Sequence, residues 1–362
     1  MDSKRDLLAQ VFERFAEREC DAEPLYAALC RIAADAPELL ALVRAAPREQ
    51  RRPNLLLAAV HDRVLAGDPH ALASYFPSVG GTREVDPALR AAFLDFCARH
   101  AGALRDCIAH RTTQTNEVGR CAVLWPALRH IAARFGCARI ALLDFGCSGG
   151  LNLGVDRYRY DYGEFILGAA AGPAVPSIEC RLEAARRPAL VEAAPWAICE
   201  RLGIDPEPVD LDDEAAVRWL RACLWPHDGV RRRRLDLALQ IARAQRWPVR
   251  RQADCTAAAL AWAAALPSDT LPVVFNSWVL TYMASDALAS HVRQMQALVQ
   301  RGALWLCAEE PRLAIGAPGT LSIATPKPAG TLWTLVSRGA EAPRYETLAR
   351  SHAHGKWLEW LA

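Results

Sequence analysis

The chain has 362 residues, and its 52% hydrophobic content is enough for the core of one large domain or two ordinary ones. Its 43 basic and 41 acidic residues nearly cancel, which makes nucleic-acid binding through bulk charge unlikely and favours a small-molecule partner. No apolar run is long enough to span a bilayer, and the first 20 residues are too charged for a secretory signal, so we expect a cytoplasmic protein without membrane contact. The 12 cysteines stand singly, which predicts reduced, buried thiols and no metal site.

The first part of the chain predicts helices. Apolar residues recur there at a spacing near 3.6, most clearly over residues 5–20, 23–35, 53–67 and 87–110. Prolines and glycines separate these segments, and no strand is predicted among them. We therefore expect residues 1–135 to form a helical N-terminal domain or cap.

After Gly136, short β-rich runs alternate with helical ones, which predicts an α/β fold with a parallel, doubly wound sheet. The predicted strands cover residues 139–145, 196–205, 249–254, 271–279, 302–309 and 332–337. Helices are predicted over residues 213–225, 231–246, 255–266 and 286–300. Residues from about 158 to 194 fit neither period and are expected to form a hairpin or loop insertion in a domain of residues 136–362.

The stretch IALLDFGCSGGLNL, residues 140–153, carries two overlapping motifs at the end of the first predicted strand. Read as D-x-G-x-S-x-G, with Asp144, Gly146, Ser148 and Gly150, it resembles the turn that holds S-adenosylmethionine in Rossmann-like methyltransferases. Read as G-x-S-x-G, it is the nucleophile elbow of α/β-hydrolases. The first interpretation makes Ser148 a cofactor contact, and the second makes it a nucleophile.

The hydrolase interpretation needs further partners for Ser148. An elbow serine requires an oxyanion loop upstream and an acid and a histidine downstream. Only predicted helices precede the strand that leads to Ser148, which disfavours this interpretation. Two histidines near the C-terminus, His352 and His354, keep the order serine, acid, histidine open. An α/β-hydrolase-like enzyme therefore stands as an alternative.

The cofactor interpretation gives the small residues of the turn a physical reason. Gly146 allows a backbone conformation that a side chain would hinder, and Gly150 lets a following helix begin close to a ligand. Free amides at that helix start suit the carboxylate of the methionine moiety, and Asp144 would face its ammonium group. The expected cofactor contacts in this turn are Asp144, Gly146, Cys147, Ser148, Gly149, Gly150 and Asn152.

Polar residues at the ends of later predicted strands extend this cofactor site. Asp205 is placed to accept hydrogen bonds from ribose hydroxyls, and Asp254 to receive the adenine amino group, with Cys255 opening the next helix. Asn276 lies at the end of the fourth predicted strand, where open α/β sheets bind ligands. Each has a simpler explanation, because Asp205 can shape a turn, Asp254 can cap a helix and Asn276 can be satisfied by neighbouring backbone.

Several motifs together resemble one known family. They are TQTNEVGRCAVLWPAL, DFGCSGGLNLGVDRYRYDYG, GIDPEPVDLDD, WLRACLWP, VVFNSWVLTYM and HAHGKWLEWL. These sequences are similar to a bacterial family described as domain of unknown function 2332, whose members resemble class I S-adenosylmethionine-dependent methyltransferases. The resemblance implies a Rossmann-like mixed sheet of the methyltransferase type. One departure is that DRYRYDYG soon interrupts the helix expected after the turn, so Asp205 lies far downstream.

Two polar segments are candidates for substrate binding. Asn116 and Arg120 precede the first strand and are expected to form a polar lid, in which Arg120 grips a carboxylate; helix capping with a solvated arginine is the alternative. Tyr158 and Tyr160 alternate with arginines, which favours an amphipathic surface for an aromatic or anionic substrate. A self-contained, salt-bridged loop would give the same pattern.

The acceptor side is expected after the fourth strand. Ser277 and Trp278 are candidate substrate contacts there, and Asn276, Tyr282 and His354 are candidates for orienting or deprotonating the acceptor. The sequence thus favours S-adenosylmethionine-dependent methyl transfer to a small acceptor. A non-catalytic cofactor-binding protein is a further alternative, and the oligomeric state stays open.

Overall fold

The computed structural model describes residues 6–20, 23–114, 116–183, 186–189, 194–313, 315 and 330–362. The chain divides into two compact units, one of residues 1–115 and 212–233 and the other of residues 116–211 and 234–362. The second unit therefore includes the helix that precedes the first strand. The first unit includes a segment that lies, in the sequence, between two strands of the sheet.

The first unit is helical, which confirms the prediction from the apolar spacing. Its helices are α1 (Leu7–Arg18), α2 (Pro24–Ala34), α3 (Pro37–Val43), η1 (Arg48–Gln50), α4 (Pro53–Leu65), η2 (Ala71–Tyr75), η3 (Pro77–Val79), α5 (Ala88–Arg99), α6 (Ala101–His110) and α8 (Glu214–Ala222). Proline opens α2, α3 and α4, at a position where a backbone N–H is not needed. Asp6 caps α1 by accepting a hydrogen bond from Leu8 N at 3.0 Å.

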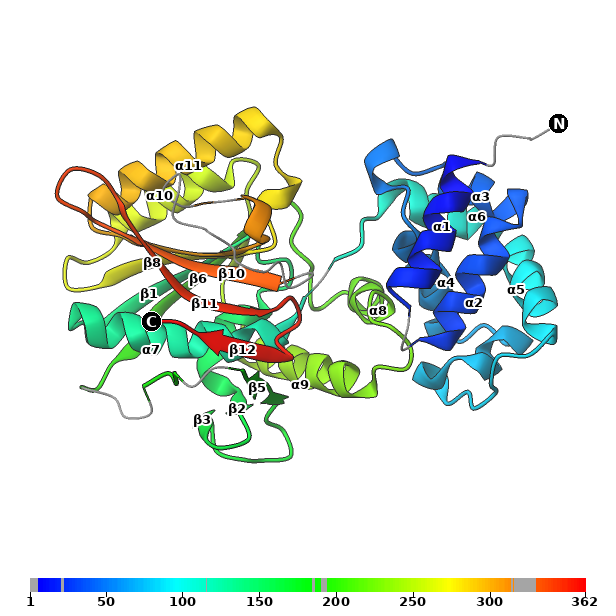
Figure 1. Cartoon of the computed structure of the whole chain (residues 1–362), viewed down its shortest axis with the longest axis horizontal. Coiled ribbons are helices and arrows are strands. Elements are labelled where there is room, and N and C mark those ends of the chain that lie inside the picture. The colour runs from blue at the N-terminus through cyan, green and yellow to red at the C-terminus, as the bar shows by residue number, and fades with distance from the viewer. Residues whose placement is uncertain are drawn as a thin grey trace. The chain divides into compact units, whose positions relative to one another are not determined.

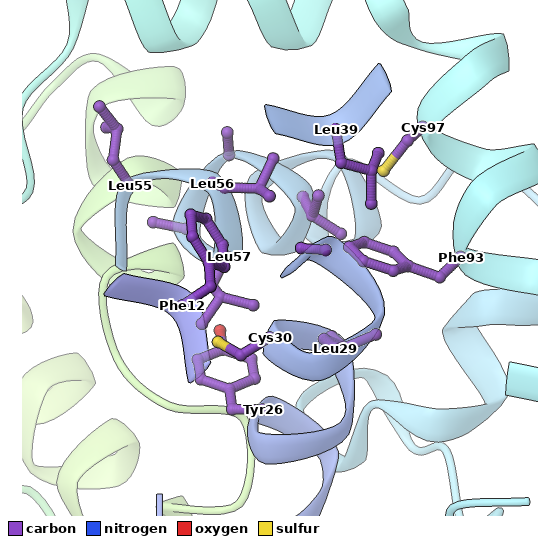
Figure 2. Packing of buried hydrophobic residues seen from close by; sticks show 14 of the residues in the cluster. Phe12, Tyr26, Leu29, Cys30, Leu39, Leu55, Leu56, Leu57, Phe93 and Cys97 are labelled. Atoms are coloured by element: carbon purple, nitrogen blue, oxygen red, sulfur yellow. The ribbon is translucent and has the colours of Figure 1, made fainter. Parts of the chain in front are cut away.

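Apolar side chains from α1 to α5 point toward one another and fill the core of this unit (Figure 2). Phe12, Leu29 and Phe93 are completely buried. Helix α8 belongs to the same core through Trp219, whose indole N–H also donates to the Thr112 carbonyl oxygen at 3.0 Å. The segment around α8 is thus held by the first unit's hydrophobic core.

Deleting residues 1–110 is expected to cause aggregation. The deletion removes the partners of α8 and exposes Trp219, and exposed apolar surface of this kind drives association. Size-exclusion chromatography and urea unfolding of the fragment check the prediction. A monomeric fragment that unfolds cooperatively would contradict it.

The second unit is built on a nine-stranded sheet with the order β5-β12-β11-β10-β9-β8-β1-β6-β7 (Figure 1). The strands of the chain are β1 (Arg139–Phe145), β2 (Arg159–Asp161), β3 (Ile166–Gly168), β4 (Ser177–Glu179), β5 (Arg181–Leu182), β6 (Ala197–Asp205), β7 (Val249–Arg251), β8 (Leu271–Ser277), β9 (Leu304–Glu309), β10 (Gly330–Ser337), β11 (Arg344–His352) and β12 (Trp357–Trp360). Strands β7, β6, β1, β8 and β9 run parallel, whereas β10, β11 and β12 continue the sheet antiparallel. This arrangement confirms an α/β fold with a mostly parallel sheet.

Helices cover both faces of this sheet (Figure 1). The helical segments of this unit are η4 (Val118–Arg120), α7 (Cys121–Phe135), η5 (Leu151–Arg157), α9 (Gly229–Gln245, with its first turn in the first unit), α10 (Cys255–Ala265), η6 (Leu280–Tyr282), α11 (Ser285–Gln300) and η7 (Pro311–Leu313). Helices α10 and α11 lie on one face and α7 on the other. Helix α7 ends at Gly136, whose φ of 59° is a left-handed C-cap that delivers the chain into β1.

The segment expected to be a hairpin or loop insertion contains a small second sheet with the order β3-β2-β4. Strands β2 and β3 pair antiparallel, and β4 joins β2 in parallel. Among the described residues, no helix combines the length and the apolarity that crossing a membrane requires.

Candidate functional site

The turn after β1 has an unusual backbone. Gly146, Ser148 and Gly150 have φ values of 72°, 50° and 70°. A Cβ atom at Gly146 would lie 2.4 Å from a methyl carbon of Val279, so this position requires glycine for space as well as for conformation. Ser148 holds a left-handed conformation despite its side chain, which costs about 1 to 3 kcal/mol and is typical of functional sites.

Side chains from two other segments hold this turn. Ser148 N donates to Asp205 Oδ2 at 2.8 Å, and Gly149 N donates to Asn116 Oδ1 at 3.1 Å. Asn116 Nδ2 in turn donates to Ser148 Oγ at 2.7 Å. The amides expected to meet a ligand carboxylate are therefore engaged by Asp205 and Asn116. The structure brings Asn116, Ser148, Gly149 and Asp205 together in a self-supporting turn.

The chain after the turn does not form the expected α-helix. Residues Leu151–Arg157 form the short 3₁₀ helix η5, which leads directly into β2. The expected helix N-terminus for a ligand carboxylate is thus corrected to a short 3₁₀ segment. The tyrosines of DRYRYDYG begin immediately afterwards, and all three are buried.

Asp144, the next-to-last residue of β1, is a buried carboxylate with one unsatisfied oxygen. Only 2% of the residue is exposed, and Oδ2 has no hydrogen-bond partner within the described part of the chain. Burial raises the pKa of Asp144 to about 7, against a hydrogen bond from Asn152 that lowers it. A buried, charged oxygen without a hydrogen-bond donor lowers the stability of the ligand-free protein, because its desolvation is not compensated. It is the kind of atom that a cationic ligand group would satisfy.

Asp205 is the last residue of β6, as expected. Asp254 directly precedes α10. Asp205 Oδ1 accepts from Glu207 N at 2.8 Å, so both of its oxygens already hold one backbone N–H. Asp254 caps α10 by accepting from Ala257 N at 2.9 Å. Each structural alternative is therefore realised, although a carboxylate oxygen has room for a second donor. Cys255 opens α10 and is buried.

Asn276, in β8, is committed to an internal network. Its Nδ2 donates to Glu309 Oε1 at 2.7 Å, and its Oδ1 accepts from Trp305 Nε1 at 2.6 Å. The side chain is 1% exposed. Asn276 is therefore not placed to touch an acceptor, as the sequence suggested, and instead orients Glu309.

Glu309 is a site residue that the sequence reasoning missed. It closes β9, is 3% exposed, and accepts through Oε1 from Val279 N at 2.9 Å as well as from Asn276. Oε2 has no hydrogen-bond partner among the residues the structure describes. Burial raises the pKa of Glu309, while its hydrogen bonds lower it. The available signal was an acid at the end of the fifth predicted strand.

The chain that leaves β8 is also strained. Trp278 has a φ of 55°, and its indole N–H donates to Thr331 Oγ1 at 2.8 Å. Ser277, the last residue of β8, is buried, and its hydroxyl oxygen has no partner in the described residues. Tyr282 lies in η6 and is 71% exposed. The structure thus places Ser277 and Trp278 at the sheet edge and Tyr282 on the surface.

Arg120 ties the lid segment to this edge. Its Nε donates to the Ala353 carbonyl at 2.9 Å and one Nη to the Ser277 carbonyl at 3.3 Å, while the guanidinium lies 5.9 Å from the centre of the Trp278 ring. The residue is only 6% exposed. The alternative of a solvated arginine is therefore excluded, and its charge stands inside the structure, where it lowers the pKa of Asp144 and of Glu309.

His354 lies in the turn between β11 and β12, not in a strand. Its Nδ1 is 3.4 Å from Oε2 of the buried Glu117. The backbones approach closely here, because a Cβ at Gly355 would lie 2.0 Å from the Gly119 carbonyl oxygen. The lid segment is consequently a fixed part of the second unit's core, docked on this turn.

Three other predicted residues prove to be interior. Tyr158 and Tyr160 are completely buried, and their hydroxyls donate to the carbonyls of Leu151 and Val155. They do not form the expected amphipathic surface, because rings in this position hold η5 and β2 together. Cys147 is 4% exposed, and burial raises the pKa of its thiol well above the usual range, so it is inert at neutral pH.

A model of a protein family described as uncharacterized protein conserved in bacteria (DUF2332) matches residues 9–360. The chain belongs to this family. Comparison with curated proteins and with solved structures gives no match. The match to DUF2332 runs through both units, so the helical unit and the residues at the sheet edge both lie within the family's span.

In this DUF2332 protein, three buried charged side chains lie near the carboxyl ends of the parallel strands. Two buried carboxylates, Asp144 and Glu309, each present one oxygen without a partner in the described structure. Arg120 lies close enough to both to affect their pKa values. Such a site can take hydrogen-bond donors and cations at the carboxyl ends of β1 and β9.

Proposed function

We propose that the second unit of this DUF2332 protein binds S-adenosylmethionine and transfers its methyl group to a small acceptor. The observation that carries the proposal is Asp144. Its unsatisfied oxygen at the end of β1 suits the ammonium group of the methionine moiety, because a charged donor would repay the desolvation of the carboxylate.

The strand order supports the proposal. Numbered along the chain, the parallel strands β7-β6-β1-β8-β9 have the order 3-2-1-4-5, which is the order of doubly wound, Rossmann-like nucleotide-binding folds. In such sheets the order reverses beside the first strand, and ligands bind there at the carboxyl ends. Asp144 and the strained turn lie at this point.

Other residues have matching roles in the proposal. Asp205 would accept hydrogen bonds from the ribose hydroxyls through the lone pairs that the Ser148 and Glu207 amides leave open. Asp254 would receive the adenine amino group in the same way. The bound cofactor supplies an electrophilic methyl group on a sulfonium. The protein contributes alignment and exclusion of water, so a dedicated base is not required for the cofactor half of the site.

Ser148 separates this proposal from the hydrolase alternative. Its positive φ suits a nucleophile elbow as well as a cofactor turn. Its hydroxyl oxygen, however, accepts a hydrogen bond from the Asn116 amide, which also holds Gly149 N, so the hydroxyl is part of the hydrogen bonding that shapes the turn. We therefore favour a supporting role for Ser148 in the turn.

Ser148→Ala is expected to lower the affinity for S-adenosylhomocysteine by no more than about 10-fold, the effect of losing one hydrogen bond. The wild-type protein is expected to resist labelling by a fluorophosphonate probe. Calorimetry on the variant and intact-mass spectrometry of the treated wild type check both parts. Stoichiometric labelling at Ser148 would contradict the proposal and favour the hydrolase.

A further inference from the structure

Glu309 presents one oxygen in a fixed orientation. Its Oε1 accepts hydrogen bonds from Asn276 Nδ2 at 2.7 Å, Val279 N at 2.9 Å and Leu280 N at 3.3 Å. Three donors on one oxygen lock the carboxylate plane. The second oxygen, Oε2, is buried and has no partner in the described part of the chain. Oε1 alone caps the chain after β8, so Oε2 takes no part in holding this chain.

The surroundings allow Glu309 to exchange a proton. Burial raises its pKa, and the hydrogen bonds from Val279, Asn276 and Leu280, together with the charge of Arg120, lower it. The net result is a pKa above the ordinary value for glutamate, with burial as the largest cause. A buried carboxyl whose pKa is raised accepts a proton more readily than a solvated one and is a candidate general base.

Glu309 also lies on the acceptor side of the proposed cofactor site. The neighbours in the sheet are β9-β8-β1-β6, so Asp205 and Glu309 close strands on opposite sides of β1. If ribose is held at β6 and the ammonium group at Asp144, the acceptor must approach from the side of β8 and β9. Neighbouring strands lie about 4.8 Å apart, which puts β9 roughly 10 Å from β1, within reach of one small ligand.

We propose that Oε2 of Glu309 binds an N–H or O–H group of the methyl acceptor and takes its proton, so that the substrate class is an amine or a hydroxyl compound. This inference rests on the proposed function. In the transfer, the carbon–sulfur bond of the cofactor breaks and its electron pair stays on sulfur. A lone pair of the acceptor atom forms the new bond to the methyl carbon, and the displaced proton goes to Oε2. An N–H or O–H group can donate to Oε2, whereas a carboxylate acceptor has no proton to give it.

The test uses two analogues of the cofactor and needs no acceptor. S-adenosylhomocysteine lacks the transferable methyl group, whereas sinefungin carries an amino group where that methyl group would lie. A carboxylate facing the methyl position should bind this amino group through a charge-assisted hydrogen bond. We expect the full-length wild-type protein to bind sinefungin at least about 10-fold more tightly than S-adenosylhomocysteine by calorimetry.

Glu309→Gln is expected to abolish this preference while changing the affinity for S-adenosylhomocysteine by less than about 2-fold. The glutamine carbonyl oxygen can still accept the three hydrogen bonds that Oε1 receives. Glu310→Gln is the matched control, because it makes the same change one residue along at a carboxylate that is 33% exposed and paired with Arg312. The control should keep the full preference.

Two results would overturn the inference. Equal affinity of the wild-type protein for the two analogues would do so without any variant, even if Glu309→Gln does not fold. An undiminished preference in Glu309→Gln would also do so, and in both cases the proposed function would stand. Failure of the wild-type protein to bind either analogue would instead remove the proposed function, and the inference with it.

Discussion

Replacing Asp144 by asparagine is expected to weaken S-adenosylhomocysteine binding by roughly 30- to several-thousand-fold at pH 8. Truncating one partner of a buried, hydrogen-bonded charge pair costs about 2 to 5 kcal/mol, and the amide cannot offer the ligand ammonium a negative charge. Asn152, which donates a hydrogen bond to this carboxylate, is not altered, so the substitution changes only the Asp144 side chain. Calorimetry at equal protein concentration measures the effect, and a loss of less than about 3-fold would contradict the assigned role.

The same variant is expected to change the pH dependence of stability, which provides the control for folding. Because the folded-state pKa of Asp144 is raised to about 7, the stabilisation it gives is present at low pH and is lost as pH rises from about 4 to 7. Asparagine does not titrate. The free energy of unfolding of Asp144→Asn minus that of the wild type should therefore rise by about 2 to 3 kcal/mol between pH 5 and pH 8. Urea unfolding at the two pH values measures this difference.

Arg120→Met is expected to destabilise the protein by about 3 to 5 kcal/mol. The substitution removes the donors to the carbonyls of Ala353 and Ser277 and leaves the buried Asp144 and Glu309 without the nearby positive charge. The loss should be larger at pH 8 than at pH 5, because the Asp144 carboxyl, whose pKa is raised to about 7, carries more charge at the higher pH. Urea unfolding at both pH values is the measurement.

Arg250→Met is the matched control for Arg120, because it removes an exposed arginine at the end of the same sheet. Surface substitutions of this kind change stability by about 0.5 kcal/mol or less. Equal effects of the two substitutions would show that Arg120 contributes no more than a solvated side chain.

Much of the fold could be predicted from local pattern. All six predicted strands and the four predicted helices, now α8 to α11, are present. The strands β1, β8 and β9 are largely buried apolar runs, which is typical of central parallel strands. Strands β11 and β12 had no such signal. The sequence RYETLARSH carries charged residues on both of its faces, and it becomes a strand by pairing with the buried β10.

The sequence predicted where the residues of the candidate site lie better than it predicted which groups they contact. Asp144, Ser148 and Asp205 meet at one sheet edge because parallel strand ends must do so. Which oxygens bind backbone amides depends on contacts between distant segments, and sequence spacing does not report these. Asn116 illustrates the point, since its amide group completes a turn that lies 32 residues away along the chain.

The same reasoning explains the residues that were missed or reassigned. Glu309 was read only as the end of an apolar strand, although the chain after β8 folds back to donate two amides to it. Tyr158 and Tyr160 alternate with arginines as a surface loop would, yet both rings are buried and their hydroxyls donate to the carbonyls of Leu151 and Val155. Exposure of aromatic residues beside charges is decided by tertiary packing.

The measurement that tests the central proposal most directly is a calorimetric titration of the full-length wild-type protein with S-adenosylhomocysteine at pH 8. At this pH most Asp144 carboxylates are ionised in the folded protein, since their pKa is raised only to about 7. We predict saturable binding at one site per chain. Absence of binding at millimolar ligand, by a protein whose urea unfolding is cooperative, would contradict the proposal that this site holds S-adenosylmethionine.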